Sequence, residues 1–340
     1  MTLGRCAVWL MGLILVALLV GGCSLRATEP PIKPSPTLFL SRTPTPTVFP
    51  TPTKVAALTN PLDRPQWHTA SQGIPAQIGV AAVAVAPSDP LVIYLAAYEP
   101  GGLYRSDDGG ASWQPVCSGL ESLAPIALAV HPVDSDMVWV GTAAGAHRTT
   151  DGGQSWQPMA GLLQMPVYAF SLSPSGVDLY AGGEAPGVWR SVDGGQTWSL
   201  SEFVDTQSSV LSLTVASDGG VFAGTAGQGV WASQDGGETW QPAGDTLTSA
   251  HVTILRSLDD GRLYALADGR FYLSSDRGDT WQMVGPPQFE ALSFTVESAP
   301  SDRIYLGSKG DALAVSLDGG ASWSFAGDGL RHADITCLVT

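Results

Sequence analysis

The stretch Ser191-Val192-Asp193-Gly194-Gly195-Gln196-Thr197-Trp198 decides the fold, because its pattern recurs along the chain. The pattern, Ser/Thr-x-Asp-x-Gly-x-Ser/Thr-Trp, occurs six times, starting at Ser106, Thr149, Ser191, Ser233, Ser274 and Ser316. The closing tryptophans are 43, 42, 42, 41 and 42 residues apart. A repeat of this length, with four short apolar runs in each copy, is typical of propeller blades. The sequence therefore predicts a ring of small four-stranded sheets.

Each position of the motif has a structural role. The aspartate can accept hydrogen bonds from main-chain N–H groups of its own turn, and the glycine supplies the positive φ that a tight turn needs. The tryptophan opens the next strand and can bury its ring between neighbouring sheets. Six equivalent copies suit a repeat better than a catalytic or metal site. We therefore predict structural roles for Asp108, Trp113, Asp151, Trp156, Asp193, Trp198, Asp235, Trp240, Asp276, Trp281, Asp318 and Trp323.

This motif is the Asp box, and residues 66–340 resemble the Asp-box, or BNR-repeat, β-propeller family. The family includes sialidases, xyloglucanase-type glycoside hydrolases, sortilin-type receptor domains and photosystem II assembly factors. The resemblance therefore does not select a function. It does imply that the Asp-box turn joins the third and fourth strands at the outer rim, away from the central pore where ligands bind in these relatives.

The number of apolar runs predicts an all-β propeller with six complete four-stranded antiparallel blades and a partial seventh. An unmatched first strand, Ile335-Thr336-Cys337-Leu338-Val339, ends the chain, and an unmatched last strand around Trp67 begins the repeat region. Pairing of these two segments would close the ring and remove exposed sheet edges. A seven-position ring with a defective blade, a ring compressed to six blades and a truncated reading frame remain three alternatives. Geometry favours the first.

Residues 1–23 are typical of a bacterial lipoprotein signal peptide. The apolar run from Ala7 to Val20 is shorter than the roughly 20 residues that a membrane-spanning helix needs. It ends in Val20-Gly21-Gly22-Cys23, which resembles a lipobox with Cys23 as the acylated residue. An ordinary signal peptide with an incidental cysteine is the alternative. The expected location is extracytoplasmic, with lipid on Cys23 as the sole membrane anchor.

Residues 24–65 are expected to form a disordered tether. The segment contains ten prolines and no periodic apolar pattern, so it cannot bury a core. At about 3.1 Å per residue, an extended polyproline chain of this length reaches on the order of 130 Å. Such a tether would carry a folded head at residues 66–340 well clear of a membrane surface.

The composition argues against several classes of partner. A net charge of −15 repels the phosphate backbone, so nucleic-acid binding is not expected. The five histidines have no metal-ligand spacing, and the glycine-rich stretch after Gly224 joins two predicted strands without the helix of a dinucleotide site. We expect no metal or cofactor and a monomeric head.

The sequence favours a non-enzymatic scaffold that binds a protein, peptide or glycan on the pore face. Residues of the loops on that face that are candidates for ligand contact are Tyr98, Glu99, Glu184, His251, Lys309 and Arg331. Photosystem assembly factors of similar layout, which the resemblance includes, make an assembly role a reasonable hypothesis.

The alternative is a sialidase-like or xyloglucanase-like glycoside hydrolase. Hydrolysis needs two carboxylates roughly 5–5.5 Å or 6.5–9.5 Å apart. The pore-face loops could supply them from Glu99, Glu121, Glu184, Asp205, Asp245, Asp268, Glu290 and Asp311. Three observations argue against it. The Arg-Ile-Pro element of sialidases is missing, because Gly73 precedes Ile74-Pro75. Arg105, Arg148 and Arg190 sit at one repeat position on three blades. The nearly constant repeat length leaves little room for a catalytic loop.

Overall fold

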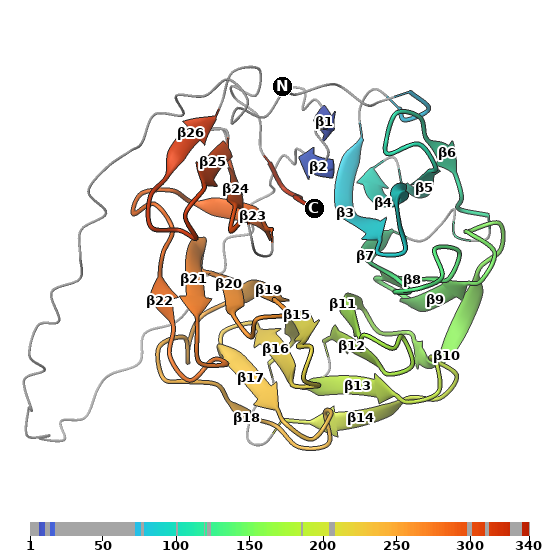
Figure 1. The fold of residues 1–340 in the computed structure, drawn as a ribbon. Coiled ribbons are helices and arrows are strands. Elements are labelled where there is room, and N and C mark those ends of the chain that lie inside the picture. Colours follow the sequence, from blue (N-terminus) through green and yellow to red (C-terminus); the bar gives the residue numbers. More distant parts are fainter. Residues whose placement is uncertain are drawn as a thin grey trace, which may run out of the picture.

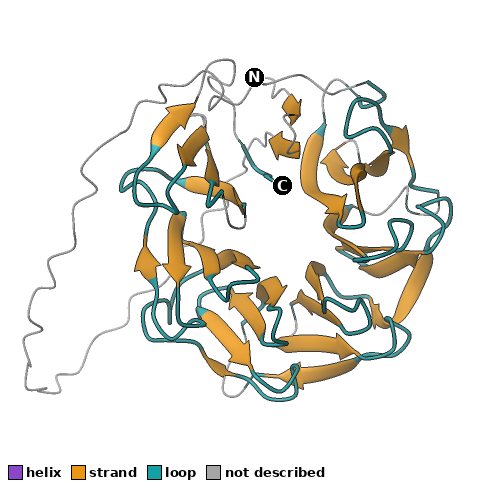
Figure 2. Cartoon of the chain, in the orientation of Figure 1, coloured by secondary structure: helices purple, strands orange, loops and turns teal. Residues whose placement is uncertain are grey.

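The structure is a computed structural model that describes residues 7–10, 14–17, 72–75, 78–99, 101–118, 120, 124–184, 186–203, 208–297, 301–309, 313–326 and 335–339. Every regular element within these residues is a β-strand, and none of them forms a helix long and apolar enough to cross a membrane. Six antiparallel sheets of four strands each surround a common centre (Figures 1 and 2). The all-β propeller with six complete blades is confirmed.

The strands of each blade pair in chain order. Blade 1 contains β3 (Gly79–Ala86), β4 (Asp89–Glu99), β5 (Gly102–Ser106) and β6 (Gln114–Pro115). Blade 2 contains β7 (Pro125–Val130), β8 (Val138–Thr142), β9 (Gly145–Thr149) and β10 (Gln157–Leu163). Blade 3 contains β11 (Val167–Leu172), β12 (Leu179–Gly183), β13 (Gly187–Ser191) and β14 (Ser199–Glu202). Blade 4 contains β15 (Val210–Val215), β16 (Val221–Thr225), β17 (Val230–Ser233) and β18 (Gln241–Pro242). Blade 5 contains β19 (Val252–Ser257), β20 (Leu263–Ala267), β21 (Arg270–Ser274) and β22 (Gln282–Met283). Blade 6 contains β23 (Ala291–Val296), β24 (Ile304–Ser308), β25 (Leu313–Ser316) and β26 (Ser324–Ala326). A separate two-stranded sheet pairs β1 (Ala7–Leu10) with β2 (Ile14–Ala17).

The first strand of every blade faces the centre of the ring and the last lies at the rim (Figure 1). We call the central surface lined by β3, β7, β11, β15, β19 and β23 the hub. Since the strands alternate in direction, the turns between first and second strands share one face of the ring with the Asp boxes. We call this the motif face. The turns between second and third strands and the blade-to-blade connections lie on the opposite face, the loop face.

The Asp boxes have the geometry that their residue types predict. In the third copy, the Ser191 hydroxyl donates to Asp193 Oδ1 over 2.8 Å and accepts the N–H of Gly195 over 2.8 Å. The other carboxylate oxygen of Asp193 accepts the Thr197 hydroxyl over 2.6 Å. Gly194 and Gly195 have φ values of 71° and 83°. Each box joins the third strand of its blade to the fourth, as predicted.

The Asp-box carboxylates predict a loss of stability in acid. Hydrogen bonds donated by Ser155 and Thr149 lower the pKa of Asp151 to about 2, from an ordinary value of 3.8. The same bonds lower the pKa values of the other five box aspartates. A carboxylate with a depressed folded-state pKa contributes stability above its unfolded pKa, and this is lost as pH falls through the folded value.

We therefore expect the urea midpoint to stay constant above about pH 4 and to fall steeply from there to about pH 2. In that range the box aspartates bind protons in the unfolded chain but not in the folded one, which favours unfolding. The variant Asp151→Asn removes one titrating group and should make that fall shallower. Urea titrations at a series of pH values measure both. A midpoint that is equal at about pH 5 and pH 2 would contradict this role of the boxes.

The core lies between neighbouring blades. All five residues of β8, β12, β16, β20 and β24 are buried, because the second strand of a blade is covered by the sheets on both sides. The motif tryptophans join the blades at the rim. The indole N–H of Trp156 donates to the Val116 carbonyl over 2.7 Å, and that of Trp323 to the Val284 carbonyl over 2.8 Å. In both cases the acceptor belongs to the preceding blade.

The C-terminal segment 335–339 continues the hub beyond blade 6. Ile335, Leu338 and Val339 are buried. The Ser293 hydroxyl of β23 donates to the Ile335 carbonyl over 2.8 Å, as the Ser212 hydroxyl of β15 donates to the carbonyl of Val252 in the next blade. On its other side, the segment packs Val339 into the core cluster of blade 1. Figure 1 shows the C-terminus between β23 and β3.

The segment 72–75 contacts the Asp box of blade 1. Gln72 forms a parallel bridge with Ser112, and its carbonyl accepts the Trp113 N–H over 2.9 Å. In blade 2, Gly161 of the outermost strand likewise lies against the motif tryptophan of the next blade, Trp198. The predicted signal peptide, Cys23, the tether and the predicted strand around Trp67 fall outside the described residues, apart from β1, β2 and the segment 72–75.

Candidate functional site

The structure places the described candidates for ligand contact on the loop face. Glu184 follows β12 with its side chain exposed, and its Oε1 accepts the Tyr168 hydroxyl of β11 over 3.1 Å. His251 is exposed just before β19, and its backbone N–H donates to Asp268 Oδ1 over 3.2 Å. Tyr168 therefore connects the loop face at Glu184 with the hub.

The other candidates lie elsewhere around the same face. Lys309 is exposed at the end of β24, and Tyr98 and Glu99 are the last two residues of β4. Arg331 falls outside the described residues. No hydrogen bond or ion pair joins Glu184, His251 and Lys309, the three candidates whose side chains the structure describes. They share a face but are spread over several blades, so they do not form one compact cluster.

Arg256 is the one charged residue on the six innermost strands, and sequence analysis missed it. These strands read GVAAVAVA, PIALAV, VYAFSL, VLSLTV, VTILRS and ALSFTV. Arg256 is exposed, with Leu255 buried on one side of it and the half-buried Ser257 on the other. Arg256 is the fifth of the six residues of β19, and because β19 is an innermost strand, its exposed side chain faces the hub. The signal in the sequence was one cation among otherwise uncharged inner strands.

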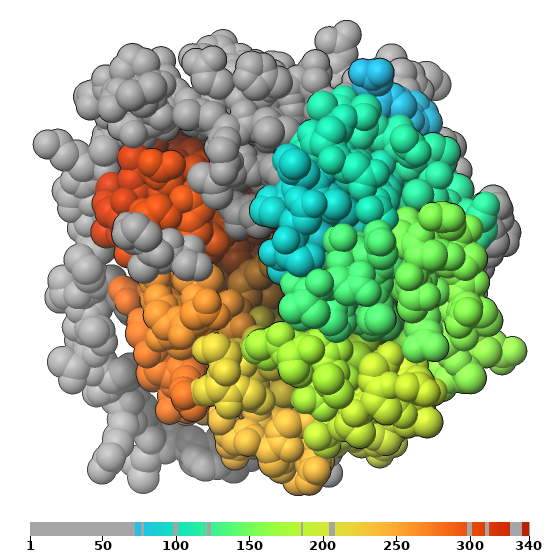
Figure 3. Space-filling model, turned by 45° about the vertical axis from the view of Figure 1, so that its right-hand side comes forward, coloured from blue at the N-terminus to red at the C-terminus, as the bar shows by residue number. Residues whose placement is uncertain are grey.

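The exposed Arg256 side chain has protein atoms close to its guanidinium. Surrounding protein lowers its pKa from the ordinary value. The thiol of Cys337, in the segment 335–339, is close enough to feel its charge, although burial has the larger effect and raises the pKa of that thiol. Next to Arg256, the Ser257 and Thr214 hydroxyls are hydrogen-bonded to each other over 2.8 Å. Figure 3 shows the middle of the ring as a hollow between the blades.

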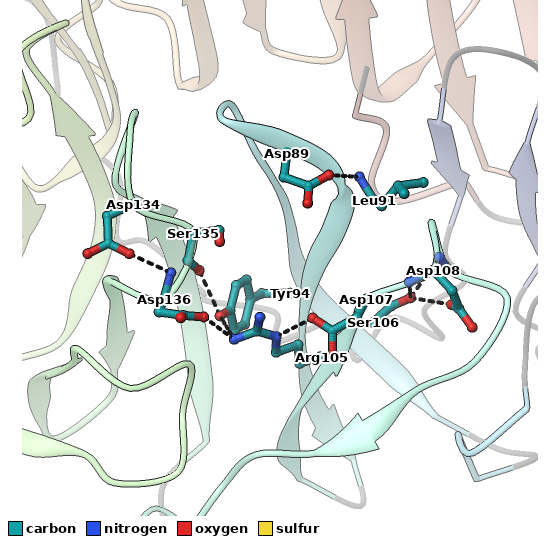
Figure 4. A network of polar contacts seen from close by, with 11 residues as sticks. Asp89, Leu91, Tyr94, Arg105, Ser106, Asp107, Asp108, Asp134, Ser135 and Asp136 are labelled. Carbon is teal, nitrogen blue, oxygen red and sulfur yellow. Dashed lines mark hydrogen bonds and ion pairs between the residues drawn. The ribbon is translucent and has the colours of Figure 1, made fainter.

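The arginines that precede three of the Asp boxes hold blades together instead of a ligand. Arg105 Nη1 donates to Asp136 Oδ1 of blade 2 over 2.5 Å and to the Tyr94 hydroxyl over 2.9 Å (Figure 4). Its Nε donates to Asp107 over 2.8 Å. Burial alone would lower the pKa of Arg105, but its hydrogen bonds to Asp136 and Asp107 raise it. The Tyr94 hydroxyl donates to the Ser135 carbonyl, which adds a second link to blade 2.

The two equivalent arginines reach the next blade in the same way. Arg148 donates to the Gly194 carbonyl over 3.4 Å, and Arg190 pairs with Glu238 over 3.2 Å. All three arginines are therefore at equivalent motif-face positions, as predicted. They do not converge into a clamp for one substrate.

A cavity of about 310 Å³ opens on the motif face between blades 4 and 5. Its lining includes Phe222, Gln234 and an ion pair between Arg277 and Asp218. Arg277 directly follows the aspartate of the fifth Asp box and has a φ of 61°. The other five copies have glycine at this position. The Arg277–Asp218 pair joins blade 5 to blade 4, so we interpret the charged residues of this cavity as a contact between blades and not as a ligand site.

The described residues include no cluster of three or more His, Cys, Asp or Glu side chains that could hold a metal ion. Carboxylates occur on the loop face but not on the innermost strands, whose sequences contain neither Asp nor Glu. Asp268, one of the carboxylates considered for hydrolysis, accepts a backbone hydrogen bond from His251 at the end of a tight turn. Glu121, Asp205 and Asp311 fall outside the described residues.

Comparison with known families and structures agrees with this architecture. The DUF6242 beta propeller domain matches residues 212–334, and the BNR/Asp-box repeat matches residues 189–200, which contain the third box. No curated protein sequence matches the chain. The family matches cover blades 4 to 6 and one motif of blade 3.

Several solved structures share the fold. An ancestral GH74 enzyme is 21% identical with a TM-score of 0.60, over 72% of this chain and 36% of that chain. The GH74 enzyme of Niastella koreensis is 18% identical with a TM-score of 0.61, over 72% and 45%. YCF48 bound to D1 peptide is 20% identical with a TM-score of 0.58, over 73% and 81%. The chain thus spans less than half of either GH74 enzyme. At these identities the likeness shows the fold alone.

Proposed function

The chain is an Asp-box (BNR) repeat β-propeller, and from this premise we propose that it is a non-enzymatic binding scaffold. Its ligand is a protein, peptide or glycan, which it holds on the loop face and in the hub. The rim motifs are occupied with internal hydrogen bonds, so recognition falls to the surfaces that the repeat leaves free. Lipid on Cys23 and the tether 24–65 would hold the head outside the cytoplasmic membrane.

One observation carries the proposal: the six innermost strands present a single cation and no carboxylate to the hub. Glycoside hydrolysis requires an acid and a second carboxylate on either side of the scissile bond. The hub, with its aliphatic side chains, hydroxyls and one arginine, can bind a ligand but supplies no carboxylate, so hydrolysis would depend on the loop-face carboxylates alone.

The extent of the structural likeness agrees with this proposal. The chain matches 81% of YCF48, whose structure holds D1 peptide, but only 36% and 45% of the two GH74 enzymes. A single propeller of this size thus corresponds to nearly a whole binding protein and to a minor part of the enzymes. Peptide binding by this chain is an inference from that correspondence and from the hub chemistry.

We further propose that the ring has seven positions, the last of them a partial blade. The contact of Ile335 with Ser293 repeats the contact of Val252 with Ser212, so the segment 335–339 takes the place of a seventh innermost strand. The segment 72–75 meets Trp113 as an outermost strand of a preceding blade would. The two terminal segments together would complete the circle without the two middle strands.

The lipid anchor has a direct test. The full chain is produced in bacteria that grow in the presence of an alkyne fatty acid. We expect the protein to carry this alkyne label and to sediment with the membranes. Cys23→Ala should abolish labelling and release the protein from the membrane fraction. Cys117→Ala is the matched control and should change neither result. Label that persists on Cys23→Ala would contradict the lipobox interpretation.

The binding function is tested by comparing capture with catalysis. The full chain is used as bait for crosslinked membrane extracts, alongside a loop-face variant, Glu184→Gln/His251→Ala/Lys309→Gln. A motif-face variant of exposed residues, Val133→Ala/Gln154→Ala/Val192→Ala, is the control. We expect one partner to be enriched by the unmodified chain and the control, and lost with the loop-face variant. Turnover of a fluorogenic glycoside or xyloglucan oligosaccharide, abolished by a single loop-face carboxylate-to-amide change, would overturn the proposal.

A further inference from the structure

Arg256 differs from the other arginines that the structure describes. Each of the others has a hydrogen-bond or ion-pair partner: a carboxylate for Arg105, Arg190, Arg262 and Arg277, a carbonyl for Arg148 and Arg270, and the Tyr305 hydroxyl for Arg303. Arg256 has no hydrogen bond or ion pair with any residue in the described part of the chain. It is an exposed cation facing the hub, between the buried Leu255 and the half-buried Ser257.

The fold does not require a charge at this position. The strand pairings place Thr214 of β15 and Thr295 of β23 at the position that Arg256 has in β19. Both threonines are neutral and buried, and the equivalent residues of blades 1 to 3, Ala84, Ala129 and Ser171, are neutral as well. Arg256 is instead exposed and carries the only charge on the six innermost strands. Its presence in the hub is therefore explained better by a ligand that completes it than by the needs of the repeat.

The surroundings define what that ligand carries. Arginine presents a planar fork of donors that matches a carboxylate in a bidentate arrangement. The rest of the chain is strongly acidic, with a net charge of −15, so the outer surface repels an anion and any attraction must be local. The innermost strands that line the hub consist largely of aliphatic residues. They suit a peptide chain better than a sugar, which needs many hydrogen-bonding groups.

We propose that the hub binds a peptide through a carboxylate that pairs with the Arg256 guanidinium. The inference rests on the proposed binding function and adds the chemistry of its ligand. The carboxylate is either the C-terminus of the peptide or an acidic side chain. The hydroxyl of Thr253, which is also exposed on β19, lies on the same strand between Arg256 and the loop face. In this arrangement the peptide enters from the loop face and passes Thr253 before it reaches Arg256.

The test follows the guanidinium itself. The Nε–Hε resonances of the full chain, purified in detergent, are recorded by NMR, and the Arg256 resonance is identified as the one missing from Arg256→Gln. We expect acetate to shift that resonance in a saturable way, whereas chloride at equal ionic strength does not. An Arg256 resonance that acetate leaves in place would overturn the carboxylate site.

Binding measurements with three peptides then distinguish a C-terminal carboxylate from an acidic side chain. The probes are a short apolar peptide with a free C-terminus, its C-terminal amide, and the amide with one internal aspartate. At least one acid form should bind about tenfold or more tightly than the plain amide, and Arg256→Gln should remove that preference. Arg256→Lys should keep part of it, since lysine keeps the charge but not the fork. Arg270→Gln, a loop-face control, should keep all of it. Equal binding of acid and amide forms would overturn the proposal.

A stability measurement separates a ligand site from a structural arginine. Because Arg256 is exposed and has no hydrogen-bond partner among the described residues, Arg256→Met should leave the melting temperature nearly unchanged while abolishing the acid preference. A lowered melting temperature would assign Arg256 to the structure. If the captured partner is retained by Arg256→Gln and lost by the loop-face variant, the scaffold function stands and the carboxylate site falls. If neither variant changes capture, the binding function itself fails.

Discussion

Deleting residues 335–340 is expected to destabilise the head by about 5–9 kcal/mol, because three fully buried apolar side chains each contribute about 1.5–3 kcal/mol. The three are Ile335, Leu338 and Val339, which are 1%, 3% and 7% exposed. Domains of this kind have only about 5–15 kcal/mol of stability in total. The shortened chain should therefore unfold at much lower urea concentration or fail to fold, and urea titration measures the difference.

A replacement and a rescue make this test specific to ring closure. Replacing residues 335–339 by Gly and Ser preserves the chain length but should be nearly as destabilising as the deletion. A synthetic peptide of residues 333–340, added in excess, should bind the shortened chain and restore much of its midpoint. A deletion that leaves the midpoint unchanged would contradict the role of this segment as a seventh innermost position.

Replacing Trp139 by alanine is expected to cost about 3–5 kcal/mol of unfolding free energy. Trp139 lies in β8, is 0% exposed and packs in a cluster that joins blades 2 and 3. Its indole N–H has no hydrogen-bond partner in the described residues. Trp139→Phe should therefore lose packing volume without breaking a hydrogen bond, and should cost much less than Trp139→Ala.

The control for Trp139 is Val133→Ala in the turn that precedes β8. Val133 is 73% exposed, so this substitution should change the unfolding free energy by no more than about 0.5 kcal/mol. Equal effects of Trp139→Ala and Val133→Ala would show that the blade 2 to blade 3 interface does not stabilise the ring. Chemical denaturation of the three variants side by side provides the comparison.

The Asp boxes made the fold predictable from the sequence because they act locally. The bonds among Ser191, Asp193 and Thr197 close within one turn and need no information from other blades. Strand order followed from the same logic, since short antiparallel strands pair with their sequence neighbours. The position of Arg105, Arg148 and Arg190 on the rim was also evident, because a repeat places equivalent residues at equivalent sites.

The hub was harder to predict because it depends on long-range closure. The sequence showed that Arg256 follows an apolar run, but only the circle of strands shows that its side chain faces a common centre. The contact between Ser293 and Ile335 likewise depends on where blade 6 ends relative to blade 1. Strand alternation places the described loop-face candidates on one face of the ring. Which of them meet a common ligand depends on loop conformations that carry no repeat signal.

The central claim is that the hub and loop face bind a ligand while the motif face supports the ring. Hydrogen–deuterium exchange on the full chain, alone and with its captured partner, tests this claim most directly. The account predicts slower exchange on binding in the peptides around Glu184, His251 and Lys309 and in β19, with the Asp-box turns unchanged. Protection confined to the Asp-box turns, with none in β19 or the loop face, would contradict it.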